Sequence, residues 1–466
     1  MALTQSEQAR RKSARRFGPT RSLALLRAWW SDAGHSALAQ RVAGTAFLIR
    51  VASAAIAYLS QILLARWMGA HEFGIYVYVW TWVLLIGGLF DLGQAQGSQR
   101  FIPEYSERGR ADLLRGFLAG SRWLAFAVAT GAAVVAALAI LLATPVLEHY
   151  LVLPLFLACL CLPVYAFTGV QEGIGRSYNW LHLGMAPPYI LRPLLLLLFM
   201  AGAYSLGMPL DAASAMLAAV GACWLTAVVQ LVTLDRRLAK TVPAGAKAYE
   251  VRTWLKVSIP IFLVESFYLL LTYTDILVLK QFHAPQEIAV YHAAAKTLAL
   301  VAFVSFSVSA AVAHRFTEYH VSGNRERLAE FLAESIRWTF WPSLAGAAVI
   351  LALGQPLLWL FGPDFLRGYS FMFVLAVGLL ARAAIGPVER LLNMLGEQNI
   401  CAAVYALAFA LNLAGCLLLV PRYGGLGAAI ATSTALVVES ILLFAVTKRR
   451  LGLHVFIWRR SGREGA

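Results

Sequence analysis

Runs of about twenty apolar residues recur along the whole chain, and no other feature limits its fold as strongly. A helical run of this length, rising about 1.5 Å per residue, is long enough to cross a hydrocarbon layer of about 30 Å. Of the 466 residues, 60% are hydrophobic and only 14% are charged, too few charges to cover a soluble protein of this size. An all-α polytopic membrane protein is therefore predicted, with about twelve spans at 44–65, 75–95, 123–143, 150–170, 186–206, 213–234, 258–279, 288–312, 339–361, 371–392, 400–420 and 425–447.

The Lys and Arg residues that give the chain its net charge of +15 are divided unequally between the two sides of the predicted membrane. If the N-terminus is cytoplasmic, 31 of the 39 Lys and Arg residues lie at or beyond the inner ends of the spans, and four lie outside. This excess is the positive-inside pattern of membrane proteins. It predicts that both termini face the cytoplasm. It also predicts that the basic residues orient the protein in the bilayer and do not bind a nucleic acid.

The twelve spans divide into two sets of six at the basic segment 235–257. We expect an N-lobe at 44–234, a cytoplasmic linker at 235–257, a C-lobe at 258–447 and a basic tail at 448–466. The preceding basic arm, 1–43, carries Leu23, Leu26 and Trp30 on one helical face, which favours an interfacial helix on the inner leaflet. No cleavable signal peptide is expected, because the first apolar run begins behind some forty polar and basic residues.

A weak sequence similarity between the two halves supports two parallel repeats. Glu72 and Tyr76 follow the first span, and Glu287 and Tyr291 follow the seventh, each pair separated by 215 residues. Spans one and seven also run in the same direction, as expected for repeats related by an axis along the membrane normal.

The soluble segments are too short to hold a catalytic domain. The longest predicted cytoplasmic connection is 96–122, and the sequence has no metal-binding Asp-x-Asp pair, zinc-protease helix, phosphate-binding loop or nucleophile elbow. The five cysteines lie in or beside spans, which argues against a disulfide framework or a zinc site, and His314, Glu318 and His320 lack the further ligand that a metal site needs. We expect no enzymatic activity, no catalytic residue, no metal and no cofactor, apart from a coupling ion, H+ or Na+.

Nine charged residues lie inside the predicted spans, where each costs at least about 2.5–3.5 kcal/mol at the bilayer centre. The bases are Arg50, Arg192, Lys296 and Arg382, and the acids are Asp91, Glu265, Asp275, Glu389 and Glu439. Such residues usually face a bundle interior or a wet cavity. Arg382 is predicted near the middle of its span, with Gly378 and Gly386 leaving room beside it.

Helical spacing places several of these charges on polar stripes. One stripe in span seven comprises Ser258, Glu265, Tyr268, Thr272 and Asp275, and one in span ten comprises Gly378, Arg382, Gly386, Glu389 and Asn393. The stripes predict a polar central cavity between the two lobes. The alternative is hydrogen bonding that only holds neighbouring helices together.

From residue 42 to 447 the chain resembles the polysaccharide-unit flippases of the multidrug/oligosaccharidyl-lipid/polysaccharide exporter superfamily. In the first half, the resemblance lies in Leu64-Ala65-Arg66-Trp67-Met68-Gly69 followed by Glu72-Phe73-Gly74-Ile75-Tyr76, and in Asp91-Leu92-Gly93. In the second half, it lies in Asp275 and in Phe361-Gly362-Pro363-Asp364-Phe365. It ends with the stretch from Asn412 to Pro421 followed by Tyr423-Gly424-Gly425-Leu426-Gly427-Ala428-Ala429-Ile430-Ala431-Thr432. His314 departs from the pattern, since a Pro is expected after span eight. The Gly-rich run also predicts a tight outer turn, and Glu72 and Phe73 are predicted to shape a turn.

The resemblance implies two six-helix lobes that rock around a central cavity between inward-open and outward-open states. It implies a polyprenyl-diphosphate-linked oligosaccharide as cargo, moved across the bacterial inner membrane for lipopolysaccharide or exopolysaccharide synthesis, with other polysaccharide-assembly proteins as partners. Because guanidinium groups suit phosphate oxygens, we predict an anion cradle of Arg50, Arg192, Lys296 and Arg382. Glu265 and Asp275 are predicted to couple an ion or to balance charge.

Two other functions remain open. A multidrug antiporter of the same superfamily would move cations, and would favour an acidic cavity, whereas the spans here carry four bases. A membrane polymerase or ligase of lipid-linked sugars would usually carry a large outer loop, and every predicted outer loop has about a dozen residues or fewer.

Overall fold

The computed structural model describes residues 35–302, 308, 312, 325–395 and 397–458. These residues form helices and connections without any β-strand. The chain divides into two compact units, 1–49 and 50–466. The first is described only as the start of one long helix, and the account below concerns the second. The expected interfacial helix and the residues His314, Glu318 and His320 lie outside the described residues.

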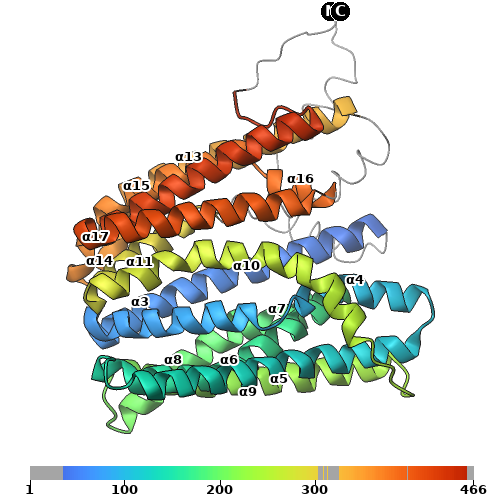
Figure 1. Cartoon of the computed structure of the whole chain (residues 1–466), viewed down its shortest axis with the longest axis horizontal. Helices are drawn as coiled ribbons and strands as arrows, with labels where there is room; N and C mark the ends of the chain where they lie inside the picture. The colour runs from blue at the N-terminus through green and yellow to red at the C-terminus, as the bar shows by residue number, and fades with distance from the viewer. Residues whose placement is uncertain (1–34, 303–307, 309–311, 313–324, 396, 459–466) are drawn as a thin grey trace, which may run out of the picture. The chain divides into compact units, whose positions relative to one another are not determined.

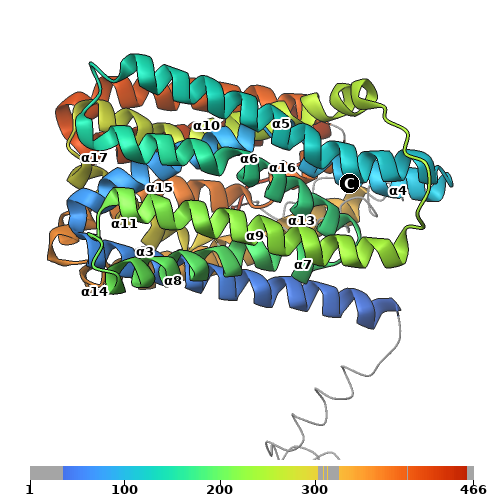
Figure 2. The same ribbon diagram turned by 90° about the horizontal axis from the view of Figure 1, so that it is seen from below.

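The N-terminal half of the larger unit packs its helices around α6 and α9. Its elements are α3 (His35–Leu89), α4 (Gln94–Glu107), α5 (Ala111–Ala143), α6 (His149–Ser177), α7 (Leu181–Ala186), the π-helical turn η1 (Pro187–Leu191), α8 (Arg192–Ser205) and α9 (Ala212–Thr241). Helix α5 packs on α6, and α9 packs on α6 and α8, as the two views agree (Figure 1, Figure 2). Spans one and two are both in α3, and the backbone turns between them at Gly69, with φ 74°.

The C-terminal half is built in the same way around its last helix. Its elements are α10 (Val251–Phe282), α11 (Pro285–Ala299), α13 (Arg325–Ala352), α14 (Gly354–Trp359), the 3-10 turn η2 (Pro363–Gly368), α15 (Tyr369–Ile385), α16 (Val388–Met394) and α17 (Gln398–Leu451). Helix α17 packs on α10 and α15, and α13 packs on α15 (Figure 1). The backbone of α17 turns at Gly424, with φ 55°, which confirms a turn between spans eleven and twelve.

The helices confirm a polytopic membrane protein. Within the described residues, eight helical segments are long and apolar enough to cross a membrane. Two of them, Ile49–Glu107 and Asn399–Leu451, each contain two predicted spans. The two remaining predicted spans, 288–312 and 339–361, correspond to α11 with the residues that follow it, and to α13.

Three helix boundaries in the structure differ from the ends of the predicted spans. Most of the segment 96–122 is helical, as α4 and the start of α5, and the connection between α9 and α10 comprises only residues 242–250. Polar helix formers extend a helix beyond its apolar span once it leaves the lipid, so the basic segments are read too easily as loops. Span ten also breaks, because α15 ends at Ile385 and Gly386 adopts φ 64° before α16. Arg382 therefore lies in the last turn of α15 and not mid-span.

The two halves meet closely near the turn that follows span one. Gly74 lies against the backbone of Pro285, where an added Cβ would be only 1.8 Å from the carbonyl oxygen. Arg66 donates hydrogen bonds to the carbonyl oxygens of Leu360 (2.6 Å) and Trp359 (2.5 Å) and stacks on the Trp359 ring. Lys280 forms an ion pair with Glu148 across the same boundary. In the predicted topology this is the outer side of the membrane.

Candidate functional site

Arg192 is held by aromatic rings from two other helices. It begins α8 directly after η1, where Pro187 and Pro188 cannot supply the backbone N–H groups of a regular helix and the turn widens to a π-helix. Such turns often mark functional sites. The Arg192 guanidinium lies 5.6 Å from the centre of the Trp80 ring and 5.0 Å from that of Tyr165. Among the described residues, no carboxylate lies within ion-pair distance of Arg192.

Arg50 lies in the same region of the N-terminal half. Its guanidinium is 5.6 Å from the centre of the Tyr189 ring. The Tyr189 hydroxyl donates to Glu172 Oε1 at 3.3 Å, and Arg176 forms an ion pair with the same carboxylate at 3.5 Å. Tyr189 also interacts electrostatically with Tyr165, so the structure brings the Arg50 and Arg192 sites together around two tyrosines.

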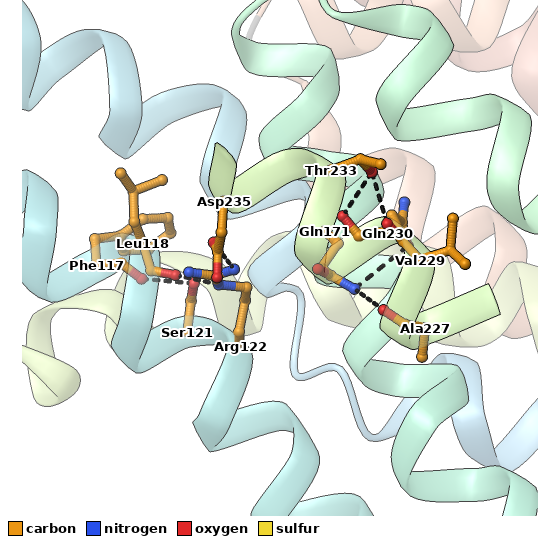
Figure 3. Close-up of polar contacts among 10 residues, drawn as sticks. All are labelled: Phe117, Leu118, Ser121, Arg122, Gln171, Ala227, Val229, Gln230, Thr233 and Asp235. Carbon is orange, nitrogen blue, oxygen red and sulfur yellow. Dashed lines mark hydrogen bonds and ion pairs between the residues drawn. The ribbon is translucent and has the colours of Figure 1, made fainter. Parts of the chain in front are cut away.

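Buried polar contacts fix the helices that carry these side chains. Gln230 on α9 donates to the carbonyl oxygen of Gly184 in α7 at 2.9 Å, just before η1. Figure 3 shows the neighbouring contact between Gln171 and Gln230 and the ion pair of Arg122 with Asp235, at 2.7 Å, that joins α5 to α9. Because a buried amide is costly to leave unpaired, these contacts hold η1 in a fixed place on the lobe.

Arg382 lies in a different setting, between two carboxylates and two tyrosines of the C-terminal half. Its guanidinium is 3.4 Å from Glu389 Oε2, 3.5 Å from Glu439 Oε1 and 3.2 Å from the Tyr405 hydroxyl, and it stacks on Tyr268 at 5.4 Å. We call these five residues the Arg382 cluster. The two acids favour the interpretation in which Arg382 balances charge over the one in which it binds an external anion.

The space expected beside Arg382 is filled by neighbouring helices. A Cβ on Gly378 would lie 2.9 Å from Ser433 Cα on α17, and one on Gly386 would lie 2.8 Å from Ile336 Cγ1 on α13. These glycines therefore permit close helix packing, and the prediction that they leave room beside Arg382 was wrong.

Lys296 and Glu265 are both exposed although they lie in predicted spans. Lys296 is in the last turn of α11, one turn after the buried His292, and no hydrogen bond or ion pair of Lys296 occurs within the described part of the chain. Glu265 on α10 interacts electrostatically with Glu389 and Arg390. The roles predicted for Lys296 and Glu265 stay predictions.

Asp275 is buried in a hydrogen-bonded network of the C-terminal half. Its Oδ2 accepts from the Tyr291 hydroxyl at 2.5 Å and from the Thr432 hydroxyl at 3.3 Å. Thr432 also contacts Asn412 at 3.4 Å. The predicted stripe of span seven is thereby divided, because Glu265 is exposed whereas Asp275 faces α11 and α17. Asp91, another acid of the spans, accepts from the backbone N–H of Gly93 at 2.8 Å and shapes the turn between α3 and α4.

Sequence reasoning missed the aromatic residues of the site. Tyr273 on α10 lies in the neighbourhood of Tyr165, Tyr189 and Arg192 of the other half and of Tyr268 of the Arg382 cluster. The only sequence signal was the presence of Tyr residues within spans, which does not reveal which of them meet.

The chain belongs to the polysaccharide biosynthesis protein family, whose profile matches residues 42–320. The profile of the MatE family matches residues 260–418. A comparison with curated protein sequences gave no match.

Solved structures of three transporters share the fold. An inward-facing multidrug resistance MATE family transporter of the MOP superfamily is 16% identical, with 87% of this chain and 94% of that one covered and a TM-score of 0.67. The lipid II flippase MurJ, in an inward closed conformation, is 15% identical over 86% and 87%, with a TM-score of 0.66. A MOP superfamily transporter from Pyrococcus furiosus, described as having a binding pocket of reversed polarity, is 16% identical over 88% and 95%, with a TM-score of 0.67. The likeness establishes a two-lobed membrane fold of the MOP type.

Proposed function

We propose that the chain is a flippase that moves polyprenyl-diphosphate-linked oligosaccharides from the inner to the outer leaflet of the bacterial inner membrane. Membership of the polysaccharide biosynthesis family supports the saccharide part of this cargo, and MurJ, a neighbour in fold, is a flippase for a lipid-linked substrate. Both termini would lie in the cytoplasm, and other polysaccharide-assembly proteins would deliver or receive the lipid.

The observation that carries the proposal is the environment of Arg192. A guanidinium inside a membrane span normally has a carboxylate to balance it, yet Arg192 has aromatic faces and no carboxylate within ion-pair distance in the described residues. Stacking on rings stabilises the cation while its N–H edge stays available for a bidentate anion. A diphosphate would supply that anion, and Arg50 and Lys296 would act as additional bases of the cradle. Arg382, which has two acids beside it, would contribute least.

The tyrosines suit the rest of the cargo. Phenolic hydroxyls donate and accept hydrogen bonds, and sugar hydroxyls need both. Tyr165, Tyr189 and Tyr273 lie close to Arg192, so that a saccharide attached to a diphosphate held by Arg192 would meet them directly. Glu265 and Asp275 would couple movement to H+ or Na+.

Alternating access would require the contacts near Gly74 to separate. Arg66, Glu148 and Lys280 close the predicted outer side in this structure, which is the arrangement expected before a cargo from the inner leaflet is released. Transport would then break these contacts and form others on the inner side.

The second candidate is a multidrug antiporter, because the MatE profile matches residues 260–418. Purified protein in liposomes separates the two. We expect a fluorescent short-chain polyprenyl-diphosphate oligosaccharide to change leaflet and a cationic dye to be left in place. Dye accumulation without movement of the lipid-linked sugar would instead support the antiporter. Transfer or polymerisation of the sugar by the protein alone would identify an enzyme.

A further inference from the structure

The Arg382 cluster contains one positive and two negative groups, and one of the two acids has no access to water. The side chain of Glu439 is fully buried, whereas Arg382 and Glu389 are 30% and 32% exposed. Neither carboxylate oxygen of Glu439 has a hydrogen-bond partner within the described residues. Its one compensating contact there is the ion pair with Arg382 at 3.5 Å, and Arg382 is shared with Glu389.

The charges around the cluster do not correct this imbalance. Glu265 on α10 and Arg390 on α16 both lie near Glu389 and have opposite charges. Cys401 on α17 lies near Glu389, Glu439 and Glu397, so this side of the cluster supplies no positive charge. The remaining cluster members, Tyr268 on α10 and Tyr405 on α17, are neutral phenols. With both glutamates ionised, the cluster therefore has a net charge of −1 in the described structure.

We infer that the Arg382 cluster is a proton-binding site, in which Glu439 holds one proton while Glu389 pairs with Arg382. A buried carboxylate is strongly disfavoured without a full counter-charge, and two carboxylates that compete for one cation are relieved when one of them binds a proton. Glu389 and Arg382 are partly exposed at the edge of the cluster, and a proton would reach Glu439 from that edge.

The break between α15 and α16 at Gly386 links the protonation of Glu439 to the packing of these helices. Arg382 lies in the last turn of α15, Glu389 is in α16, and Gly386 between them has a positive φ of 64°. Glu439 lies on a third helix, α17. When Glu439 loses its proton, its carboxylate competes for Arg382 with Glu389, and the contact that joins α15 to α16 across Gly386 weakens. Loading and release of the proton thereby alter how the C-terminal half is held together. The coupling role, unlike the bound proton itself, depends on the proposed flippase function.

Infrared spectroscopy of the purified protein tests the proton without any transport. We expect the cluster to contribute the carbonyl band of one buried protonated carboxyl at neutral pH. This contribution should be lost in both Glu439→Gln and Glu389→Gln, because either change leaves a neutral Arg–Glu pair. Arg382→Gln should do the opposite and add a second protonated carboxyl, since both acids then lack a cation. Glu107→Gln, an exposed position in α4 outside the cluster, is the control and should leave the cluster band in place.

A band that survives in Glu439→Gln and Glu389→Gln would overturn the inference, as would an Arg382→Gln spectrum without added intensity. Circular dichroism and elution as a single species establish that each variant is folded, and Glu439→Asp provides a milder change that should keep the proton. In liposomes, a pH gradient should accelerate lipid movement by the wild-type protein and not by Glu439→Gln. Absence of all movement in the wild type would count against the proposed function and would leave the infrared result unaffected.

Discussion

Glu72 and Glu287 perform the same task in the two halves of the protein. Glu72 Oε2 accepts from the backbone N–H of Ala212, the first residue of the last helix of its half, at 2.9 Å. Glu287 Oε1 accepts from Gly425 N–H, where the last span of the other half begins, also at 2.9 Å. The weak sequence repeat at a spacing of 215 residues therefore reflects a repeated contact. In each half, a carboxylate that follows the first span caps the start of the sixth span of that half.

We expect Glu72→Ala and Glu287→Ala each to lower the stability of the folded protein by about 1 kcal/mol, the usual effect of losing a helix cap. The backbone N–H of Ala212 or Gly425 would then have no acceptor. Thermal unfolding in detergent measures the change, and the exposed Glu107→Ala in α4 is the control. Equal melting temperatures for all three variants would contradict a capping role.

The sequence predicted local features well, because they depend on residues close together in the chain. The spans and the turn at Gly424 are examples. Glu72 was predicted to shape a turn, and its contact with Ala212, 140 residues away, was not predicted. Arg382 and Glu389 were predicted to lie on one polar stripe, but their contact was not predicted, and Gly386 breaks the helix between them. Partners from other spans were not foreseen: Trp80 and Tyr165 meet Arg192, and Glu439 meets Arg382, through tertiary packing that no local spacing records.

Gly386 should tolerate substitution poorly. Its backbone, with φ 64° and ψ −149°, lies in a region adopted almost only by glycine, which costs an L-residue about 1–3 kcal/mol, and an added Cβ would also meet Ile336 Cγ1 at 2.8 Å. Gly452 has a similar φ of 66° with nothing within 4 Å of an added Cβ. Gly386→Ala should therefore lower the melting temperature and the cellular abundance more than Gly452→Ala does, and equal effects would show that packing against α13 is unimportant.

The ion pair of Lys280 with Glu148 should help to keep the outer side closed. Its hydrogen bond holds the pKa of Glu148 below its usual range, so the stabilisation is present at neutral pH and is lost only as the pH falls through that lowered value. Glu148→Gln should widen the separation of spin labels placed on either side of this contact. Asp112→Asn, which removes the ion pair with Arg110 within the N-terminal half, is the control and should leave that separation unchanged.

The charge distribution gives a direct test of topology. Reporter fusions after Leu234 and after Lys448 should report a cytoplasmic position, and a fusion after Leu206 a periplasmic one, because 31 Lys and Arg residues lie at or beyond the predicted inner ends. A periplasmic result at Lys448 would be incompatible with twelve spans and a cytoplasmic N-terminus.

The central claim is that a ring-stacked guanidinium binds the diphosphate of the cargo, and lipid movement by Arg192 variants in liposomes tests it most directly. Charge-assisted hydrogen bonds contribute about 1.5–3 kcal/mol, so Arg192→Ala should slow the movement of the lipid-linked sugar roughly ten- to a hundredfold. Arg192→Lys should recover little, because an ammonium lacks the bidentate fork. Arg237, which stacks on Trp180 at 5.5 Å near the end of α9, is the matched control, and Arg237→Ala should move the lipid at the wild-type rate. A folded Arg192→Ala protein that moves the lipid as fast as the wild type would contradict the account.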